Sequence, residues 1–194
     1  MSTAGLAKVT AKTAAEICKQ FELGEAAQPL LRDNLTPKQF LDLLTDKGLY
    51  VDAIRYFAFA LPKREAIWWA CQCARQGYGA NVPPKAAAAL QAAEKWVSEQ
   101  KDEGRLTAKK AGETAGNDQP GGLAALATFF AGGNIAPPGT DHKVSAPEHL
   151  TGLLSGAAVM LAGVFAQADK SAEKYKKFLA LGVDVANGMN KWKQ

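Results

Sequence analysis

Apolar residues recur along most of the chain at intervals of three and four, which is the spacing of one face of a helix. Alternation of β-branched or aromatic residues with polar ones, the pattern of strands, never extends beyond a few positions. The sequence therefore predicts an all-α protein, a single compact bundle of about seven to nine helices. We expect helices over residues 10–21, 37–47, 49–59, 62–76, 83–100, 106–115, 121–130 and 146–166, and a last helix capped by Ser171.

Helix boundaries are marked by capping residues and prolines. Thr36 suits the N-cap position, and Pro37 suits the first helical position after it. Pro62 ends one helix because it cannot donate a backbone hydrogen bond, and it opens the next helix. Ser145 and Glu148 have the spacing of a capping box and predict the start of the apolar helix that follows.

Residues 132–143, with the sequence GGNIAPPGTDHK, form the longest stretch without a helical signal. Glycine and proline exclude regular structure there, so the segment either wraps over the surface or links to the last pair of helices. We expect one domain over residues 1–194, with a possible internal boundary at this segment.

The segment AIWWACQCA, residues 66–74, is expected to be the central helix of the fold. Gln72 is its one polar residue, and a helix that is apolar on nearly all sides has to be covered on nearly all sides. Adjacent residues on a helix point about 100° apart, so its two tryptophans contact different neighbours. We place the following residues at the centre of the fold: Ile67, Trp68, Cys71, Ala74, Leu90, Ala93 and Val97.

The composition is that of an ordinary folded domain. The chain has 194 residues, of which 47% are hydrophobic and 22% are charged, so it can bury a substantial core. The six lysines and two acids that follow residue 169 account for the whole net charge of +4. Cations near a helix C-terminus suit the helix dipole, whereas a nucleic-acid surface would need arginines and interleaved aromatic residues. We therefore expect no nucleic-acid partner.

The sequence favours a cytoplasmic location. Three cysteines, Cys18, Cys71 and Cys73, are too few for a disulfide scaffold. The N-terminal sequence MSTAGLAKVTAKTAAEICKQ lacks the apolar core of a secretory signal. The longest apolar run, residues 152–166, is broken by Ser155 and falls short of the about 20 residues that a membrane-spanning helix needs. We expect a buried core helix there and no membrane span.

No residue cluster has the spacing of a catalytic or metal site. Cys71 and Cys73 lie on opposite sides of a helix and cannot hold one ion together. His142 and His149 are the only histidines, and a metal site would need further ligands from distant segments. Ser155 lacks the strand–turn–helix context of a hydrolase nucleophile. We therefore expect no enzyme activity, no cofactor and no metal.

The non-helical segment supplies one group of candidate residues for binding a partner. Loops held by a rigid scaffold carry function more often than helix faces do. Ile135 is apolar without periodic neighbours, and Asp141, His142 and Lys143 are polar residues of the same segment. The alternative is a structural wrap in which residues 135–138 pack down on the core.

Arg64 and Glu65 form a second candidate group, at the start of the helix that carries the tryptophans. They precede a wholly apolar segment, so they act either as a structural ion pair or cap, or in binding a partner. An enzyme would need a cleft assembled from such distant residues, for example Arg64 and Glu65 with Asp141 and His142.

Gly152 and Gly156 form a GxxxG pair within the apolar helix. Such a pair lets a neighbouring helix approach closely. In this chain we expect packing within the molecule, and a dimer seam is the alternative.

Five segments follow one another from residue 36 to residue 188: TPKQFLDLL, LYVDAIRYFAFALPKREAIWWACQCAR, VPPKAAAALQAAEKWV, GGLAALATFFAGGNIAPP, and HLTGLL leading to YKKFLALGVDVANG. The motif LPxREAxWWAC is the specific part, and the motif GGxxAPP follows later in the chain. Together the segments resemble an uncharacterised family of bacterial proteins of about this length, a domain of unknown function. The sequence departs from that pattern at Phe129-Phe130, where a tryptophan is expected nearby.

The resemblance implies no known catalysis and associates the chain with gene neighbourhoods of type VI secretion. It thereby implies a non-enzymatic interaction module: a cytoplasmic accessory, adaptor or chaperone-like protein in the handling of secretion effectors. Its partner would be a protein, namely an effector, an adaptor or a toxin. The alternative is an immunity protein that neutralises a cognate toxin, although such proteins often carry a strongly charged face and the charge here is modest.

Overall fold

The computed structural model describes residues 5–136, 139–190 and 192. In this part of the chain the backbone forms nine α-helices, two short 3₁₀-helices and no strand beyond an isolated bridge between Asn134 and Ser145. The prediction of an all-α fold is thereby confirmed. The 3₁₀-helices are Gln28–Leu30 and Ala168–Lys170, and the α-helices are α1 (Ala14–Cys18), α2 (Pro37–Asp46), α3 (Tyr50–Ala60), α4 (Lys63–Tyr78), α5 (Pro84–Glu99), α6 (Asp102–Ala115), α7 (Pro120–Phe129), α8 (His149–Val164) and α9 (Ser171–Ala186).

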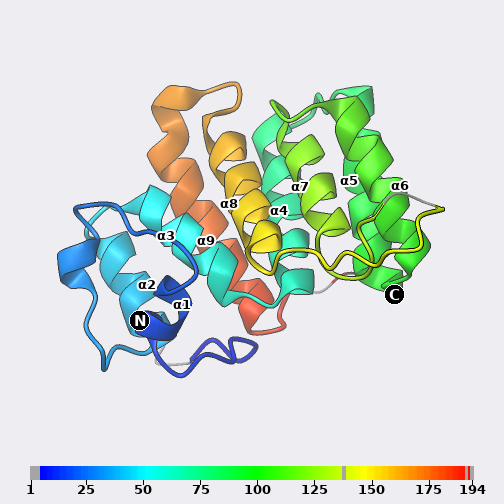
Figure 1. Cartoon of the computed structure of the whole chain (residues 1–194). Helices are drawn as coiled ribbons and strands as arrows, with labels where there is room; N and C mark the ends of the chain where they lie inside the picture. The colour runs from blue at the N-terminus through cyan, green and yellow to red at the C-terminus, as the bar shows by residue number, and fades with distance from the viewer. Residues whose placement is uncertain (1–4, 137–138, 191, 193–194) are drawn as a thin grey trace.

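The helices are arranged around α4 and α8, which pack directly on each other (Figure 1). Helices α5, α6 and α7 lie on one side of this pair, and α1, α2, α3 and α9 lie on the other side. At the start of α4, Arg64 bonds to the end of α5 and Lys63 forms an ion pair with Glu148, the residue before α8. Near the start of α6, Arg105 bonds to the carbonyl at the end of α7. These ends therefore meet at one end of the array.

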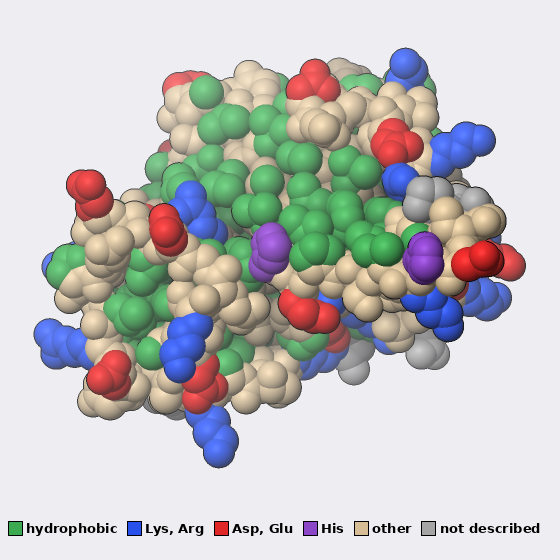
Figure 2. Space-filling view, in the orientation of Figure 1, with side chains coloured by type: hydrophobic (Ala, Val, Ile, Leu, Met, Phe, Trp, Pro, Cys, Tyr) green, Lys and Arg blue, Asp and Glu red, His purple; other side chains and the backbone are tan. Residues whose placement is uncertain are grey.

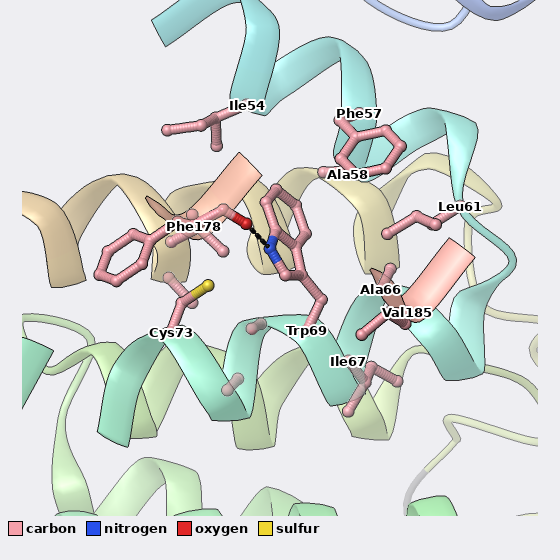
Figure 3. Packing of buried hydrophobic residues seen from close by; sticks show 14 of the residues in the cluster. Ile54, Phe57, Ala58, Leu61, Ala66, Ile67, Trp69, Cys73, Phe178 and Val185 are labelled. Atoms are coloured by element: carbon pink, nitrogen blue, oxygen red, sulfur yellow. Dashed lines mark hydrogen bonds between the residues drawn. The ribbon is translucent and has the colours of Figure 1, made fainter. Parts of the chain in front are cut away.

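Trp69 lies at the centre of the core, between α3, α4 and α9 (Figure 3). Its side chain is fully buried, and its ring meets the ring of Phe57 edge to face at a centroid distance of 5.4 Å. Its indole nitrogen donates a hydrogen bond to the carbonyl of Phe178 in α9. Because both its apolar ring and its polar nitrogen are satisfied, this tryptophan meets the usual conditions for complete burial.

The prediction that Trp68 lies at the centre of the fold is wrong. Trp68 is half-buried and contacts Trp192 near the end of the chain, with the ring centroids 6.2 Å apart. The other residues placed at the centre are fully buried: Ile67, Cys71, Ala74, Leu90, Ala93 and Val97. Nearly every position from 66 to 74 is apolar, so periodicity cannot distinguish the inward tryptophan from its neighbour.

The predicted start of α2 is confirmed in detail. The Thr36 side chain accepts a hydrogen bond from the backbone amide of Gln39, and the Gln39 side chain accepts one from the backbone amide of Thr36. Helix α4 begins at Lys63, directly after Pro62, as that proline predicts.

Other boundaries differ from the prediction. Helix α6 begins at Asp102 and not at residue 106, because acidic residues suit the first turn of a helix and Arg105 is buried there. Helix α1 covers only Ala14–Cys18, since Thr13 caps it by accepting from the Glu16 amide. Ser145 does not cap α8; it pairs with Asn134, and α8 begins at His149. Ser171 is the first residue of α9, and its N-cap is Lys170.

The GxxxG pair of α8 serves packing within the molecule. A Cβ atom at Gly152 would lie 3.0 Å from the Phe59 ring of α3, and one at Gly156 would lie 3.2 Å from Ala58. Both glycines therefore let α3 approach α8 closely. The predicted packing role is confirmed by these contacts.

Candidate functional site

From Leu150 to Val164, after the exposed His149 at its first position, the outward side of α8 is apolar. On a helix, positions three, four and seven apart share one side. Leu153 is 46% exposed and Val164 is 41% exposed, and the positions between them on this side are half-buried. The stripe consists of Leu150, Leu153, Leu154, Ala157, Met160, Leu161 and Val164.

Helix α7 continues this apolar surface. Its half-buried side chains Leu123 and Leu126, together with Phe130 directly after the helix, again follow three- and four-residue spacing. Figure 2 shows hydrophobic side chains gathered over α7 and α8 in the middle of this view of the molecule. We name these three residues and the α8 stripe together the α7–α8 face.

The α7–α8 face has no charge of its own. Neither 120–130 nor 149–164 contains an Asp, Glu, Lys or Arg residue. A surface helix normally turns a polar side to solvent, and a continuous exposed apolar patch marks an interaction site. The chemistry of the α7–α8 face is suited to binding another apolar surface.

No described helix is by itself long and apolar enough to cross a membrane. The segments His149–Val164 and Ala168–Ala186 are together long and apolar enough for a span by length and composition, but they are bent by 114° at the break between them.

Arg64 acts in the structure as a cap for α5. Its Nε donates to the carbonyl of Val97 at 2.6 Å, and an Nη donates to the carbonyl of Ser98 at 3.2 Å. These carbonyls lie in the last turn of α5, where the helix itself supplies no donor. The Arg64 guanidinium also lies over the ring of Trp192, 4.0 Å from its centroid.

Glu65 forms an ion pair with Lys8. Their side chains are 2.7 Å apart, and Glu65 is only 8% exposed. The Lys8 backbone amide donates to the carbonyl of Ala186, so the N-terminal segment is fixed to α4 and to the end of α9 at once. The structure thus gives Arg64 a capping role and Glu65 an ion-pair role, the two structural interpretations that the sequence left open.

The segment between α7 and α8 is held at its base. The Asn134 side chain accepts from the backbone amides of Ala136 and Val144, and the Ile135 amide donates to the Val144 carbonyl. Ile135 is half-buried, so it is partly packed down as the structural wrap requires. Of the other residues in that wrap, Pro137 and Pro138 lie outside the described residues.

The buried Arg105 lies beneath this base and was not found by sequence reasoning. Its guanidinium donates to the carbonyl of Phe129 at 2.8 Å and to the carboxylate of Asp102. A Cβ atom at Gly133 would overlap the Arg105 guanidinium, so the backbone of Gly133 packs directly against this guanidinium. Arg105 lies between the expected helices 83–100 and 106–115, in a charged stretch that the apolar pattern assigns to neither helix.

The structure does not gather the predicted site residues into one site. Asp141, His142 and Lys143 are exposed near the tip of the segment, whereas Arg64 and Glu65 lie at the start of α4. Both groups belong to the same end of the helical array. In the described part of the chain, no ion pair or hydrogen bond joins one group to the other.

The thiols are held in their neutral form. Burial raises the pKa of the Cys18 thiol to about 11 and raises the pKa of the Cys71 and Cys73 thiols above their usual value. A thiol with a raised pKa is a poor nucleophile and a poor metal ligand at neutral pH. Among the described residues, no group of three or more His, Cys, Asp and Glu side chains is placed to hold a metal ion.

Comparison with known proteins identifies a family but no characterised relative. No curated protein and no solved structure matches the chain. A family of unknown function, DUF6931, matches residues 40–186, which run from inside α2 to the end of α9 and include the whole α7–α8 face. The N-terminal segment with α1, and the residues after α9, lie outside that match. The chain therefore belongs to DUF6931, a family of unknown function.

Proposed function

We propose that this protein is a non-enzymatic interaction module that binds a protein partner through the α7–α8 face. The observation that carries the proposal is the exposed stripe along α8, which has no polar or charged residue from Leu150 to Val164 on its outward side. Patches of this kind on soluble domains serve association, because burying them removes apolar area from water.

The surface indicates the chemistry of the partner. A charge-free face gains nothing from ion pairs, so the matching surface is apolar as well. The ridges formed by residues three and four apart suit the grooves of another helix. We therefore infer that the partner presents the apolar side of an amphipathic helix.

The finer role we propose is that of a cytoplasmic accessory, adaptor or chaperone-like protein that handles effectors of type VI secretion. Support for this role comes from the resemblance of the sequence motifs to a family associated with such gene neighbourhoods. On this proposal the α7–α8 face, which is apolar, covers an apolar segment of the effector before secretion.

The test replaces the two most exposed residues of the face by lysine, as Leu153→Lys with Val164→Lys. Leu106→Lys on α6 is the matched control, because Leu106 has the same 46% exposure as Leu153 but lies outside the face. A photo-crosslinking residue at position 157 captures and identifies the partner in the bacterial host.

We expect the double lysine variant to lose the crosslinked partner while its helical circular dichroism and melting temperature stay near those of the wild type. The Leu106→Lys control retains the partner. Retention of the partner by the double variant contradicts the proposed binding face. A toxin as the captured protein, with protection of cells that express it, contradicts the adaptor role and assigns an immunity role instead.

A further inference from the structure

Two side chains from the first half of α4 and one from the N-terminal segment surround the ring of Trp192. The Arg64 guanidinium lies 4.0 Å and the Lys8 ammonium 5.2 Å from the ring centroid, and the ring of Trp68 meets it edge to face. We name Lys8, Arg64 and Trp68 the Trp192 cradle. Cations near an aromatic face attract it, and tryptophan is the aromatic residue that gains most from such contacts.

The cradle is largely held in place without Trp192. Arg64 is fixed by its two carbonyl acceptors at the end of α5. Lys8 is fixed by its ion pair with Glu65 and by its backbone bond to Ala186. A preformed site of this kind binds with little loss of side-chain freedom.

Trp192 and the tail that carries it come from outside the part of the chain that matches the family. Arg64 and Trp68 lie inside the matched residues 40–186, whereas Lys8 lies before them and Trp192 lies after them. Helix α9 ends at Ala186, and the chain turns back through Gly188, whose φ is +70°. The ring remains half-buried, so one side of the cradle is open to solvent.

We propose that the Trp192 cradle is a binding site for an aromatic side chain of a protein partner, and that Trp192 occupies this site in the free protein. This inference goes beyond the proposed function, because it concerns a second surface with different chemistry from the α7–α8 face. Displacement of Trp192 exchanges one aromatic ring for another. Lys8 and Arg64 therefore contact an aromatic ring both before and after binding.

The tail also indicates the sequence of the segment that would replace it. The Trp68 indole nitrogen donates to the side-chain oxygen of Asn190, two residues before Trp192. A replacing segment therefore carries an acceptor two residues before its aromatic ring. Aspartate suits this position as well as asparagine does, because Lys8 and Arg64 add positive charge nearby. The ligand class is a protein segment of the form Asn/Asp-x-aromatic.

The test uses the full-length Trp192→Ala variant, which vacates the cradle, and a fluorescently labelled peptide of residues 187–194, NGMNKWKQ. Binding is followed by fluorescence anisotropy. We expect the peptide to bind this variant at least about tenfold more tightly than the wild type, because a tethered Trp192 competes at an effective concentration on the order of millimolar. A peptide with its tryptophan replaced by alanine does not bind.

A second substitution locates the peptide. Arg64→Ala or Lys8→Ala, added to Trp192→Ala, is expected to weaken binding at least tenfold, and the Lys8 variant leaves the cap of α5 intact. Arg32→Ala, at an exposed arginine before α2, is the control and changes nothing. Absence of binding to Trp192→Ala, or equal binding with and without Lys8 and Arg64, overturns the proposal.

The two proposed surfaces can be tested separately. Peptide binding is expected to survive the lysine substitutions at Leu153 and Val164 when these are combined with Trp192→Ala. Loss of peptide binding in that combination would place the peptide on the α7–α8 face and overturn the assignment to the cradle.

Discussion

The indole nitrogen of Trp69 donates a hydrogen bond of 2.7 Å to the main-chain carbonyl of Phe178, which joins α4 to the middle of α9 inside the core. The helical pattern pairs the same carbonyl with the backbone amide of Gly182, one turn later. Gly182 faces both Trp69 and Phe57. The position of α9 therefore depends on one large side chain from α4 and on the absence of a side chain at residue 182.

Trp69→Ala is expected to lower the free energy of unfolding by about 3–5 kcal/mol, the usual effect of truncating a large core side chain. Trp68→Ala is the matched variant, and its half-buried position predicts a clearly smaller loss. Urea denaturation of both variants provides the measurement. Equal losses would show that the two tryptophans share the core, contrary to the structure.

Gly182→Ala is expected to destabilise the protein by about 1–3 kcal/mol, the range for overpacking a core. The added Cβ atom would lie 2.5 Å from a Phe57 ring carbon and 2.9 Å from the Trp69 indole nitrogen, so α9 has to shift. Gly132→Ala is the control, because its Cβ atom meets nothing within 4 Å. Thermal unfolding of both variants checks the difference, and an unchanged melting temperature for Gly182→Ala would contradict this packing.

Arg105→Ala is expected to lower the free energy of unfolding by about 1–3 kcal/mol, because it leaves the buried Phe129 carbonyl without its donor. The base of the segment before α8 also loses its support at Gly133. Hydrogen exchange is expected to speed up at the Ile135 amide, which bonds to Val144 in this base. Unchanged exchange at Ile135 would show that the segment does not depend on Arg105.

The Cys18 thiol is expected to contribute to a loss of stability in alkaline solution. Its folded pKa is raised to about 11 by burial, from a usual value of 9.0, so the unfolded chain ionises first as the pH rises. The contribution is complete below pH 9 and is lost as the pH rises towards 11. Denaturant midpoints from pH 8 to pH 11 are therefore expected to fall less steeply for Cys18→Ala than for the wild type. Parallel curves for the two proteins would argue against a raised pKa of the half-buried Cys18 thiol.

Local signals in the sequence were sufficient to predict much of the fold. Thr36, Pro37 and Pro62 act within one turn of the backbone, so their effect does not depend on the rest of the molecule, and the boundaries that they predict are confirmed. Arg105 could not be predicted in the same way. Its burial depends on the Phe129 carbonyl, which comes from a later helix. A charged run can therefore form the first turn of a helix when a distant carbonyl accepts from its buried cation.

The candidate site was less accessible to sequence reasoning. Residues 152–166 form the longest apolar run, and this pattern predicts a buried core helix, whereas Leu153 and Val164 are exposed. A sequence pattern reports which sides of a helix are apolar but not how many neighbours are available to cover them. The useful signal was the occurrence of two helices, 120–130 and 149–164, without any charged residue. A helical bundle of this size has few places to bury both completely.

The division of α8 into a side with glycines and a side with leucines has a consequence for how the family diversifies. Substitutions at Gly152 and Gly156 are limited by α3, which packs against both glycines. Leu153 and Val164 face outward, so under the proposed function selection acts on them through the partner. A family member without that partner would then be free to carry polar residues at these two positions while keeping both glycines. On this proposal, the composition of one helix would record which members have kept the interaction.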